Sequence, residues 1–368
     1  MANNFLQDAK TNKRDEFYTQ YNDIQTEIDI YVEYNKDVFR DKTILLPCDD
    51  PEWSNFTRVF VYNFEKYGLK KLISTSYAIE SKNVNWDWQP TLFETSDPQY
   101  DIKKTKCKGK IFTLERNELS NEKIDMSKLK WKYLEGDGDF RSDEVKKLRD
   151  ESDIIITNPP FSLFREFISW VIEGNKKFIV IGNKNAITYK EVFPLIKENK
   201  MWIGGTSMSK DILFDVPDEY AEYFKNTGKQ GSSYVIKNGV VYGRSSAIWF
   251  TNVEHNKRHN ELTLMTMKDY LKHSIHKDIR ENGYLHYDNY NAIEIPHTDS
   301  IPKDYEGAMG VPISFLDKYC PEQFEIIGAS ESEGKGFSNG LWDSSSKVAQ
   351  PLINGEKIYK RIFIKNKL

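Results

Sequence analysis

The sequence has few cysteines, no long apolar run and no excess of positive charge. Its three cysteines, Cys48, Cys107 and Cys320, are odd in number and far apart, which argues against a disulfide framework and against a paired-cysteine zinc site. No run of about eighteen apolar residues is present, and the polar segment 1–15 lacks the apolar centre of a signal peptide. We therefore expect a cytoplasmic protein that does not contact a membrane.

The charge balance excludes a globally basic nucleic-acid-binding protein. Lys and Arg number 52 against 56 Asp and Glu, a formal net charge of −4, so a polyanionic partner would have to meet a local patch. Positive charge gathers between residues 255 and 280, a stretch that forms either a phosphate-contacting surface or an ordinary solvated face. The candidate DNA contacts are Lys257, Arg258, Lys268, Lys272, Lys277 and Arg280.

All six histidines lie between His255 and His297. None of them follows a tight ligand spacing such as His-Glu-x-x-His. The sequence therefore predicts no metal site.

The order of apolar runs predicts the fold class. The chain of 368 residues, 39% of them hydrophobic, is long enough for two domains, or for one domain with an added module. Short apolar runs alternate with amphipathic stretches from residue 42 onward, as in a parallel sheet covered by helices. We predict strands at 43–48, 69–74, 131–134, 153–157 and 177–181, helices at 55–67, 164–172 and 189–198, and a closing strand within 239–252. The predicted class is α/β, with a doubly wound, mainly parallel sheet.

The most specific chemical signal is Asn158-Pro159-Pro160-Phe161, directly after a strand rich in isoleucine. Two consecutive prolines fix the backbone and remove two amide donors, so carbonyl oxygens there can face a ligand. Asn158 adds a carboxamide oxygen and Phe161 a flat aromatic face. This set suits a planar heterocycle that carries an NH2 group, because the ring stacks while the oxygens accept both amine hydrogens. The alternative is a strand that simply ends in a Pro-Pro turn.

These four residues resemble the catalytic motif of the S-adenosylmethionine-dependent amino methyltransferases. A wider resemblance, to the EcoRI modification methylase family of DNA adenine methyltransferases, rests on several segments in the same order. They are 15–20 (Asp-Glu-Phe-Tyr-Thr-Gln), 48–51 (Cys-Asp-Asp-Pro), 136–142, 158–166 and 182–189, followed by 310–313 and 321–324. Together they cover most of residues 15 to 328.

The resemblance implies S-adenosylmethionine as the cofactor and assigns residues to it. In the family, the motif at 15–20 covers the methionine part of the cofactor, and the turn at 136–140 reads its adenine. Asn158, Pro159, Pro160 and Phe161 are the implied catalytic residues. The implied cofactor-binding residues are Phe17, Tyr18, Thr19, Pro47, Cys48, Asp49, Asp50, Asn55, Phe56, Asp139, Phe140 and Asn158.

Two features depart from the usual methyltransferase pattern. The loop at 47–55 contains no glycine, a departure that the EcoRI-type family shares, and the second strand ends in Ser-Thr-Ser-Tyr without an acidic residue to hold ribose hydroxyls. Asp49 or Asp50 could replace that acid, and the sequence does not choose between them. Cys48 follows a proline as in carbon-5 cytosine methyltransferases, but it lies on the first strand, where a packed thiol is the better interpretation.

The resemblance also predicts the domain roles and the partners. Residues 1–253 would form the catalytic domain, with insertions at about 77–130 and 204–239, and residues 254–368 a DNA target-recognition region. We expect a monomer that flips an adenine out of duplex DNA, with no obligate protein partner and a possible cognate restriction endonuclease. The alternatives are methylation of RNA or of a protein glutamine amide, or a non-catalytic module that binds S-adenosylmethionine or nucleic acid.

Overall fold

The computed structural model describes residues 19–52, 54–78, 98–116, 131–215, 225–226, 234–331 and 336–367. The chain divides into two compact units, which are described separately. Unit 1 comprises Met1–Ala186 and Ser209–Val253, and unit 2 comprises Ile187–Met208 and Glu254–Leu368. The division after Val253 coincides with the expected domain boundary, whereas Ile187–Met208 lies in unit 2 rather than with the rest of 1–253.

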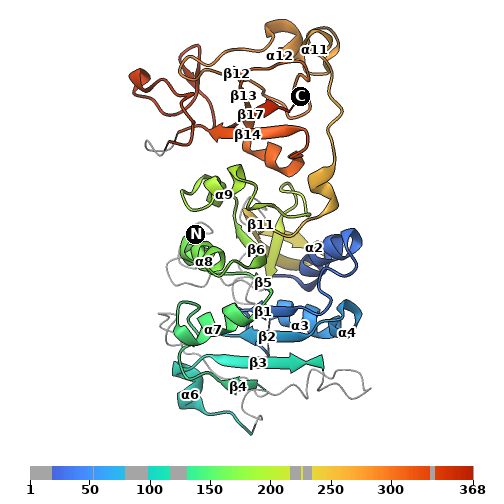
Figure 1. The fold of residues 1–368 in the computed structure, drawn as a ribbon, viewed down its shortest axis with the longest axis vertical. Coiled ribbons are helices and arrows are strands. Elements are labelled where there is room, and N and C mark those ends of the chain that lie inside the picture. Colours follow the sequence, from blue (N-terminus) through green and yellow to red (C-terminus); the bar gives the residue numbers. More distant parts are fainter. Residues whose placement is uncertain are drawn as a thin grey trace. The chain divides into compact units, whose positions relative to one another are not determined.

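A mainly parallel sheet forms the centre of unit 1 (Figure 1), as the sequence predicts. Its strands are β1 (Thr43–Leu46), β2 (Lys71–Thr75), β3 (Lys110–Glu115), β4 (Trp131–Tyr133), β5 (Ile154–Thr157), β6 (Lys177–Asn183) and β11 (Ala247–Thr251). Among the strands of unit 1 the order is β4-β3-β2-β1-β5-β6-β11. Strands β2, β1, β5 and β6 run parallel, while β3 and β11 run antiparallel to their neighbours β2 and β6.

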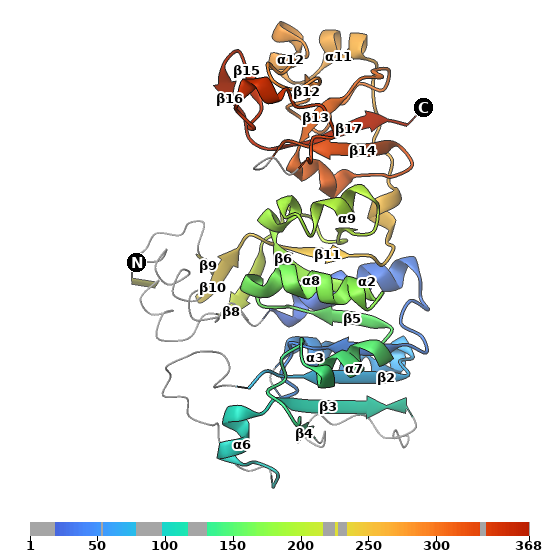
Figure 2. The ribbon, with the colours of Figure 1, turned by 60° about the vertical axis from the view of Figure 1, so that its left-hand side comes forward.

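Helices cover both faces of this sheet. Helices α7 (Asp143–Glu151) and α8 (Phe164–Glu173) lie on one face, and α2 (Tyr21–Tyr34), α3 (Asn55–Tyr62) and α4 (Phe64–Tyr67) on the other (Figures 1 and 2). The Ser54 and Ser142 side chains accept hydrogen bonds from first-turn amides and so fix where α3 and α7 begin. The predicted stop after α4 is confirmed, because Gly68 ends it with φ of +63°.

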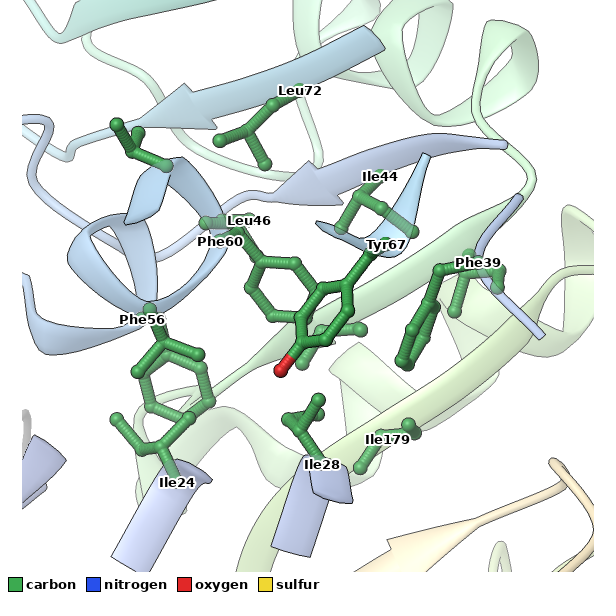
Figure 3. Packing of buried hydrophobic residues seen from close by; sticks show 14 of the residues in the cluster. Ile24, Ile28, Phe39, Ile44, Leu46, Phe56, Phe60, Tyr67, Leu72 and Ile179 are labelled. Atoms are coloured by element: carbon green, nitrogen blue, oxygen red, sulfur yellow. The ribbon is translucent and has the colours of Figure 1, made fainter. Parts of the chain in front are cut away.

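The largest hydrophobic cluster of unit 1 lies between the sheet and the helices α2, α3 and α4. Figure 3 shows Ile24 of α2 beside Phe56 and Ile28 beside Tyr67, with sheet residues such as Ile44 completing the cluster. These residues are at most 2% exposed. Burial of these aliphatic and aromatic side chains, each contributing about 1.5–3 kcal/mol, stabilises the packing of the three helices on the sheet.

Several predicted elements differ in detail from the structure. The insertion expected at 77–130 contains β3, a strand of the central sheet, so 131–134 pairs with β3 and not with the second strand. The predicted helix 55–67 is interrupted at Asn63 and forms α3 and α4. The segment 239–252 forms two strands, and only β11 extends the central sheet, antiparallel to β6.

A smaller sheet lies in the predicted insertion 204–239. It has the order β8-β10-β9, with β8 (Ile212–Asp215), β9 (Tyr234–Lys237) and β10 (Val240–Ser245). Thr19 forms an isolated antiparallel bridge with Phe214 of β8. This sheet therefore holds the first described residue of the chain within unit 1.

Unit 2 has its own sheet, with the order β12-β13-β17-β14. The strands are β12 (Ile293–Glu294), β13 (Met309–Pro312), β14 (Phe324–Ala329) and β17 (Arg361–Asn366), and β15 (Leu352–Ile353) pairs with β16 (Glu356–Lys357). Its helices are α9 (Phe193–Lys197), which is shorter than the predicted 189–198, α11 (Met267–His273) and α12 (Lys277–Asn282). None of the described helices in either unit is long and apolar enough to cross a membrane.

Candidate active site

The candidate site lies at the carboxyl ends of β1 and β5, two parallel strands that are neighbours in the sheet. From β1 the sheet continues through β2 on one side, and from β5 through β6 on the other. Ligands of doubly wound sheets bind beside such a reversal of strand order. Asp49 and Asp50 follow β1, and Asn158 follows β5, so the sequence places the predicted residues at this point.

Asp49 connects the ends of β1, β2 and β5 through hydrogen bonds. Its carboxylate accepts hydrogen bonds from Ser54 Oγ and Thr157 Oγ1, both at 2.6 Å, and its carbonyl accepts one from Ser74 Oγ at 2.6 Å. The residue is 5% exposed. Because both carboxylate oxygens already bind hydroxyl groups of the protein, Asp49 holds the ends of β1, β2 and β5 together. Ser54, Ser74 and Thr157 were not predicted site residues, although each is a small hydroxyl residue beside a predicted strand end or helix start.

Asp50 differs from Asp49 although it is the next residue. It is half-buried, and its Oδ1 accepts a hydrogen bond from the Glu52 amide at 2.8 Å. Its carbonyl accepts the Ser54 amide at 2.9 Å and closes the turn. Of the two candidate acids, Asp50 is therefore the one with a carboxylate that reaches the surface.

The segment Asn158–Phe161 leaves β5 directly at the strand reversal. Asn158, Pro159 and Pro160 are buried and Phe161 is half-buried, with its ring packed partly against the core. The Leu163 amide donates to the Pro160 carbonyl at 2.9 Å and starts the short helix Phe161–Leu163. Within the described residues, no such bond reaches the Pro159 carbonyl. The Pro159 oxygen and the half-buried Phe161 ring are thus the candidate contacts for a ligand in this segment.

The start of the described chain reaches this segment. Asn158 Nδ2 lies 3.5 Å from Thr19 Oγ1, and Asn55 Nδ2 donates to the Thr19 carbonyl at 2.8 Å. Thr19, Asn55 and Asn158, predicted from three separate parts of the sequence, therefore meet in the structure. The predicted cofactor residues Phe17 and Tyr18 lie outside the described residues.

Gln20 is the last residue of the N-terminal motif at 15–20, and the sequence alone does not mark it as a site residue. Its side-chain Nε2 is buried and has no hydrogen-bond partner in the described part of the chain. A buried donor without an acceptor costs about 1–3 kcal/mol, so a ligand acceptor at this position would be stabilising.

The turn 136–140 docks on the end of β2. Gly138 has φ of +82°, and a Cβ there would lie 2.1 Å from the Ser76 carbonyl oxygen. The Ala78 amide donates to the Asp137 carbonyl at 2.7 Å. Only glycine permits this conformation and this close approach, so Gly138 fixes the position of the acidic turn at the same edge of the sheet.

Asp139 forms a fork with Arg141. The Arg141 Nε and Nη2 atoms lie 2.9 and 2.6 Å from the two Asp139 oxygens, while Nη1 donates to Glu166 of α8 at 2.7 Å. The hydrogen bonds to Asp139 raise the pKa of Arg141 above its ordinary value. A bidentate ion pair with Arg141 thus fixes the Asp139 carboxylate in the turn.

Two predicted cofactor residues have their aromatic rings in the core. Phe140 is 4% exposed and packs against Phe167 and Trp170 of α8, and Phe56 is 2% exposed and packs against Trp249. Their rings are therefore not placed to stack on a ligand. Pro47 is buried and its carbonyl accepts a hydrogen bond from Thr75 Oγ1, while Cys48 is half-buried.

An ion pair that the sequence does not predict stabilises the glycine-free loop at 47–55. Glu52 binds Lys110 of β3, whose ammonium lies 4.6 Å from the centre of the Trp131 ring on β4. Lys110 is 3% exposed. No short motif marks this pair, because its partners are separated by 58 positions and β3 was not recognised.

The candidate DNA contacts in unit 2 separate into two groups. Lys257 Nζ lies 2.5 Å from Asp317 Oδ1, and Arg258, 7% exposed, lies over the Trp202 ring at 3.7 Å. Arg258 also pairs with Glu254 at 3.1 Å. Both cations are engaged inside unit 2, which leaves them poorly placed for phosphate.

The other candidates lie on α11 and α12 and are exposed. Lys268 and Lys272 have no ion pair within the described residues, and Lys277 pairs with Glu281 on its own helix at 3.4 Å. Arg280 donates to the Ser274 carbonyl. Surface pairs within a helix contribute only about 0.3–0.5 kcal/mol, so Lys277 can exchange Glu281 for another anion.

Comparisons with known proteins identify similar chains. The family model described as adenine-specific methyltransferase EcoRI matches residues 5–367. The type II methyltransferase M.EcoRI of Escherichia coli is 39% identical over 369 residues, covering 100% of this chain and 97% of the relative. M.MgeORF184P of Mycoplasma genitalium is 32% identical, covering 97% of each chain, and M.MpnI of Mycoplasma pneumoniae is 31% identical, covering 87% of this chain and 83% of the relative. No solved structure matches this chain.

Proposed function

This chain belongs to the EcoRI family of adenine-specific methyltransferases, and from that premise we propose that Asn158–Phe161 is where the amine of a target adenine accepts its methyl group. The protein methylates adenine in DNA in the context of restriction and modification. The observation that carries the site proposal is the position of Asn158: buried, at the end of β5, beside the reversal of strand order.

In this proposal the segment acts by positioning. The Asn158 carboxamide oxygen and the Pro159 carbonyl accept the two amine hydrogens, which makes the nitrogen more tetrahedral and exposes its lone pair. Adenine inside a duplex is stacked and paired, so it must be flipped out at a cost of a few kcal/mol. Stacking on the half-buried Phe161 ring offsets about 1–3 kcal/mol of that cost. The rate gain comes from orientation and preorganised dipoles, without a covalent enzyme intermediate.

The methyl donor in this proposal is S-adenosylmethionine, which supplies an electrophilic methyl group when bound. The donor and acceptor groups at the sheet edge fit such a molecule. The buried amide nitrogen of Gln20 suits the carboxylate of its amino-acid part, the half-buried Asp50 suits ribose hydroxyls, and Asp139 suits the adenine amine. Asp50 suits the ribose better than Asp49, which is 5% exposed and already accepts hydrogen bonds from Ser54 and Thr157.

Unit 2 is the proposed target-recognition region, with Lys268, Lys272 and Lys277 as phosphate contacts. Their exposure and their position on two adjacent helices support this assignment. We further propose a cytoplasmic monomer that acts on duplex DNA with no obligate protein partner, and a restriction endonuclease that reads the same site. The small and odd number of cysteines is in keeping with a reducing compartment.

The test is a comparison of DNA from cells that express the parent chain or Asn158→Ala. Sequencing with detection of modified bases should show N6-methyladenine at one short motif with the parent and none with the variant. Purified protein, offered duplex DNA, RNA and a glutamine-containing protein with labelled S-adenosylmethionine, should label DNA alone. Labelling of RNA or protein in preference to DNA would overturn the proposal.

A further inference from the structure

Two short segments of unit 2 with the same His-x-Asp pattern face one another. His276 and Asp278 lie at the start of α12, and His297 and Asp299 follow β12. Each histidine binds the aspartate of the other segment: His276 Nε2 lies 2.8 Å from Asp299 Oδ1, and His297 Nε2 lies 3.1 Å from Asp278 Oδ2. The pairing is reciprocal, so four potential metal ligands come together from positions 19 to 23 residues apart.

The two imidazole rings are stacked. Their centres are 3.7 Å apart and their planes differ by 7°. Ligand atoms of His276, Asp278 and His297 all lie within 4.8 Å of one another. Around a tetrahedral zinc ion with bonds of about 2.0–2.1 Å, neighbouring ligand atoms are about 3.3 Å apart. Because a metal ion lies in the plane of each imidazole that binds it, one ring must rotate out of the stack for both to bind the same ion. His276 and His297 are only half-buried and Asp278 is exposed, so their side chains can rotate.

From this geometry we propose that His276, Asp278 and His297 bind one borderline divalent transition-metal ion, of which zinc is the representative, with Asp299 beside them as the fourth ligand. Two imidazoles with one or two carboxylates favour zinc, nickel or copper over magnesium and calcium, which prefer oxygen ligands alone. The site is separate from the sheet edge of unit 1 and is independent of the proposed catalytic role.

Charge favours a divalent ion in this cluster, because one such ion balances the formal charges of the Asp278 and Asp299 carboxylates. The bound ion would tie the start of α12 to the segment after β12, which is already fixed by the hydrogen bond from Tyr284 to the Ser300 carbonyl at 2.6 Å.

The test uses the full chain without a polyhistidine tag, stripped with chelator. Calorimetric titration with zinc should give one site per chain and raise the melting temperature. Cobalt in place of zinc should give weak visible bands without an intense sulfur-to-cobalt band, because the proposed ligands are nitrogen and oxygen. Absence of binding, or a sulfur band that indicates one of the three cysteines, would overturn the proposal.

Variants locate the site. His297→Ala and Asp278→Asn should each weaken zinc binding at least about tenfold, and Asp278→Asn keeps the shape of the side chain, so it guards against loss by misfolding. His273→Ala is the matched control, because His273 is exposed on α11 and lies outside the cluster. It should bind zinc like the parent. Equal weakening in all three variants, or parent-like binding by Asp278→Asn and His297→Ala, would refute this site.

Discussion

Adjacent residues of the same type have different roles at the end of β1. Asp49 is 5% exposed and its carboxylate accepts two hydroxyl hydrogen bonds, whereas Asp50 is half-buried and accepts one backbone amide. The sequence leaves the two acids equivalent, because burial depends on Thr157, a residue more than a hundred positions away on β5. The tertiary contact, and not the local motif, separates the structural acid from the candidate ligand.

We predict that Asp49→Ala destabilises the protein by about 2–4 kcal/mol, because the buried Ser54 and Thr157 hydroxyls lose their acceptor. Urea unfolding measures this directly. The matched control is Asp50→Ala, which should unfold like the parent but weaken S-adenosylmethionine binding in calorimetry. If the two variants showed the same stability, the bracing role of Asp49 would be wrong.

His255 should make stability depend on pH. It is 2% exposed, its Nε2 lies 3.0 Å from the Ile203 carbonyl oxygen, and burial lowers its pKa to about 4 from an ordinary 6.5. Between these values the unfolded chain binds the proton and the folded chain does not, so the free energy of unfolding should decrease as pH falls from 6.5 toward 4. The full decrease is on the order of 3 kcal/mol. Denaturant titrations of the parent and His255→Gln at pH 7 and pH 5 measure it, and an equal pH effect in both would refute the role of His255.

At the scale of elements, the acidic turn 136–140 acts as a rigid unit. Gly138 docks it on Ser76, and Arg141 holds Asp139 while it also binds Glu166 on α8. The motif order alone placed this turn beside the cofactor. The structure adds the reason for its fixed position, which is a glycine conformation and an ion pair across to the next helix.

Asp139→Ala should raise the dissociation constant of S-adenosylmethionine, because the turn loses the proposed acceptor for the cofactor's adenine amine. Calorimetric titration is the measurement. Glu166→Gln is the control, since it removes the other carboxylate partner of Arg141 and leaves the turn intact. Unchanged affinity of Asp139→Ala would shift the assignment to Asp137, whose carboxylate accepts the Asp139 amide at 3.1 Å.

The helices α11 and α12 should carry nonspecific DNA affinity. Replacing Lys272 and Lys277 by Ala should weaken binding to specific and unrelated duplexes alike and reduce the salt slope by about one unit per lost phosphate contact. Lys257→Ala is the control: it breaks the ion pair with Asp317, so it should lower stability and leave the salt slope unchanged. A parent-like slope in the double variant would identify α11 and α12 as a solvated face.

The elements that the sequence predicts best are those with strong local signals. Strands β1, β5 and β6 are apolar runs ended by polar or proline residues, and the motifs that follow them mark the site. Strand β3 was missed because it lies inside a polar insertion and runs antiparallel, so it lacks the strand-helix-strand context of its neighbours. The His276 and His297 cluster was missed because its pattern exists only after folding.

At the scale of the whole molecule, the family and the fold both support a methyltransferase with its candidate site in unit 1. The match over residues 5–367 makes this chain an adenine-specific methyltransferase, and the doubly wound sheet of unit 1 places Asn158 at the reversal of strand order. Unit 2 has a separate sheet and carries the exposed lysines. The central claim is that the amine of adenine is methylated at Asn158–Phe161.

The most direct test of this claim measures turnover and cofactor binding in the same variant. Asn158→Ala should lose DNA methylation altogether while its S-adenosylmethionine dissociation constant stays within several-fold of the parent, because in the proposed site Asn158 contacts the target amine more than the cofactor. A variant that kept more than about a tenth of the parent rate would have lost less than about 1.4 kcal/mol of transition-state stabilisation. That result would contradict the account.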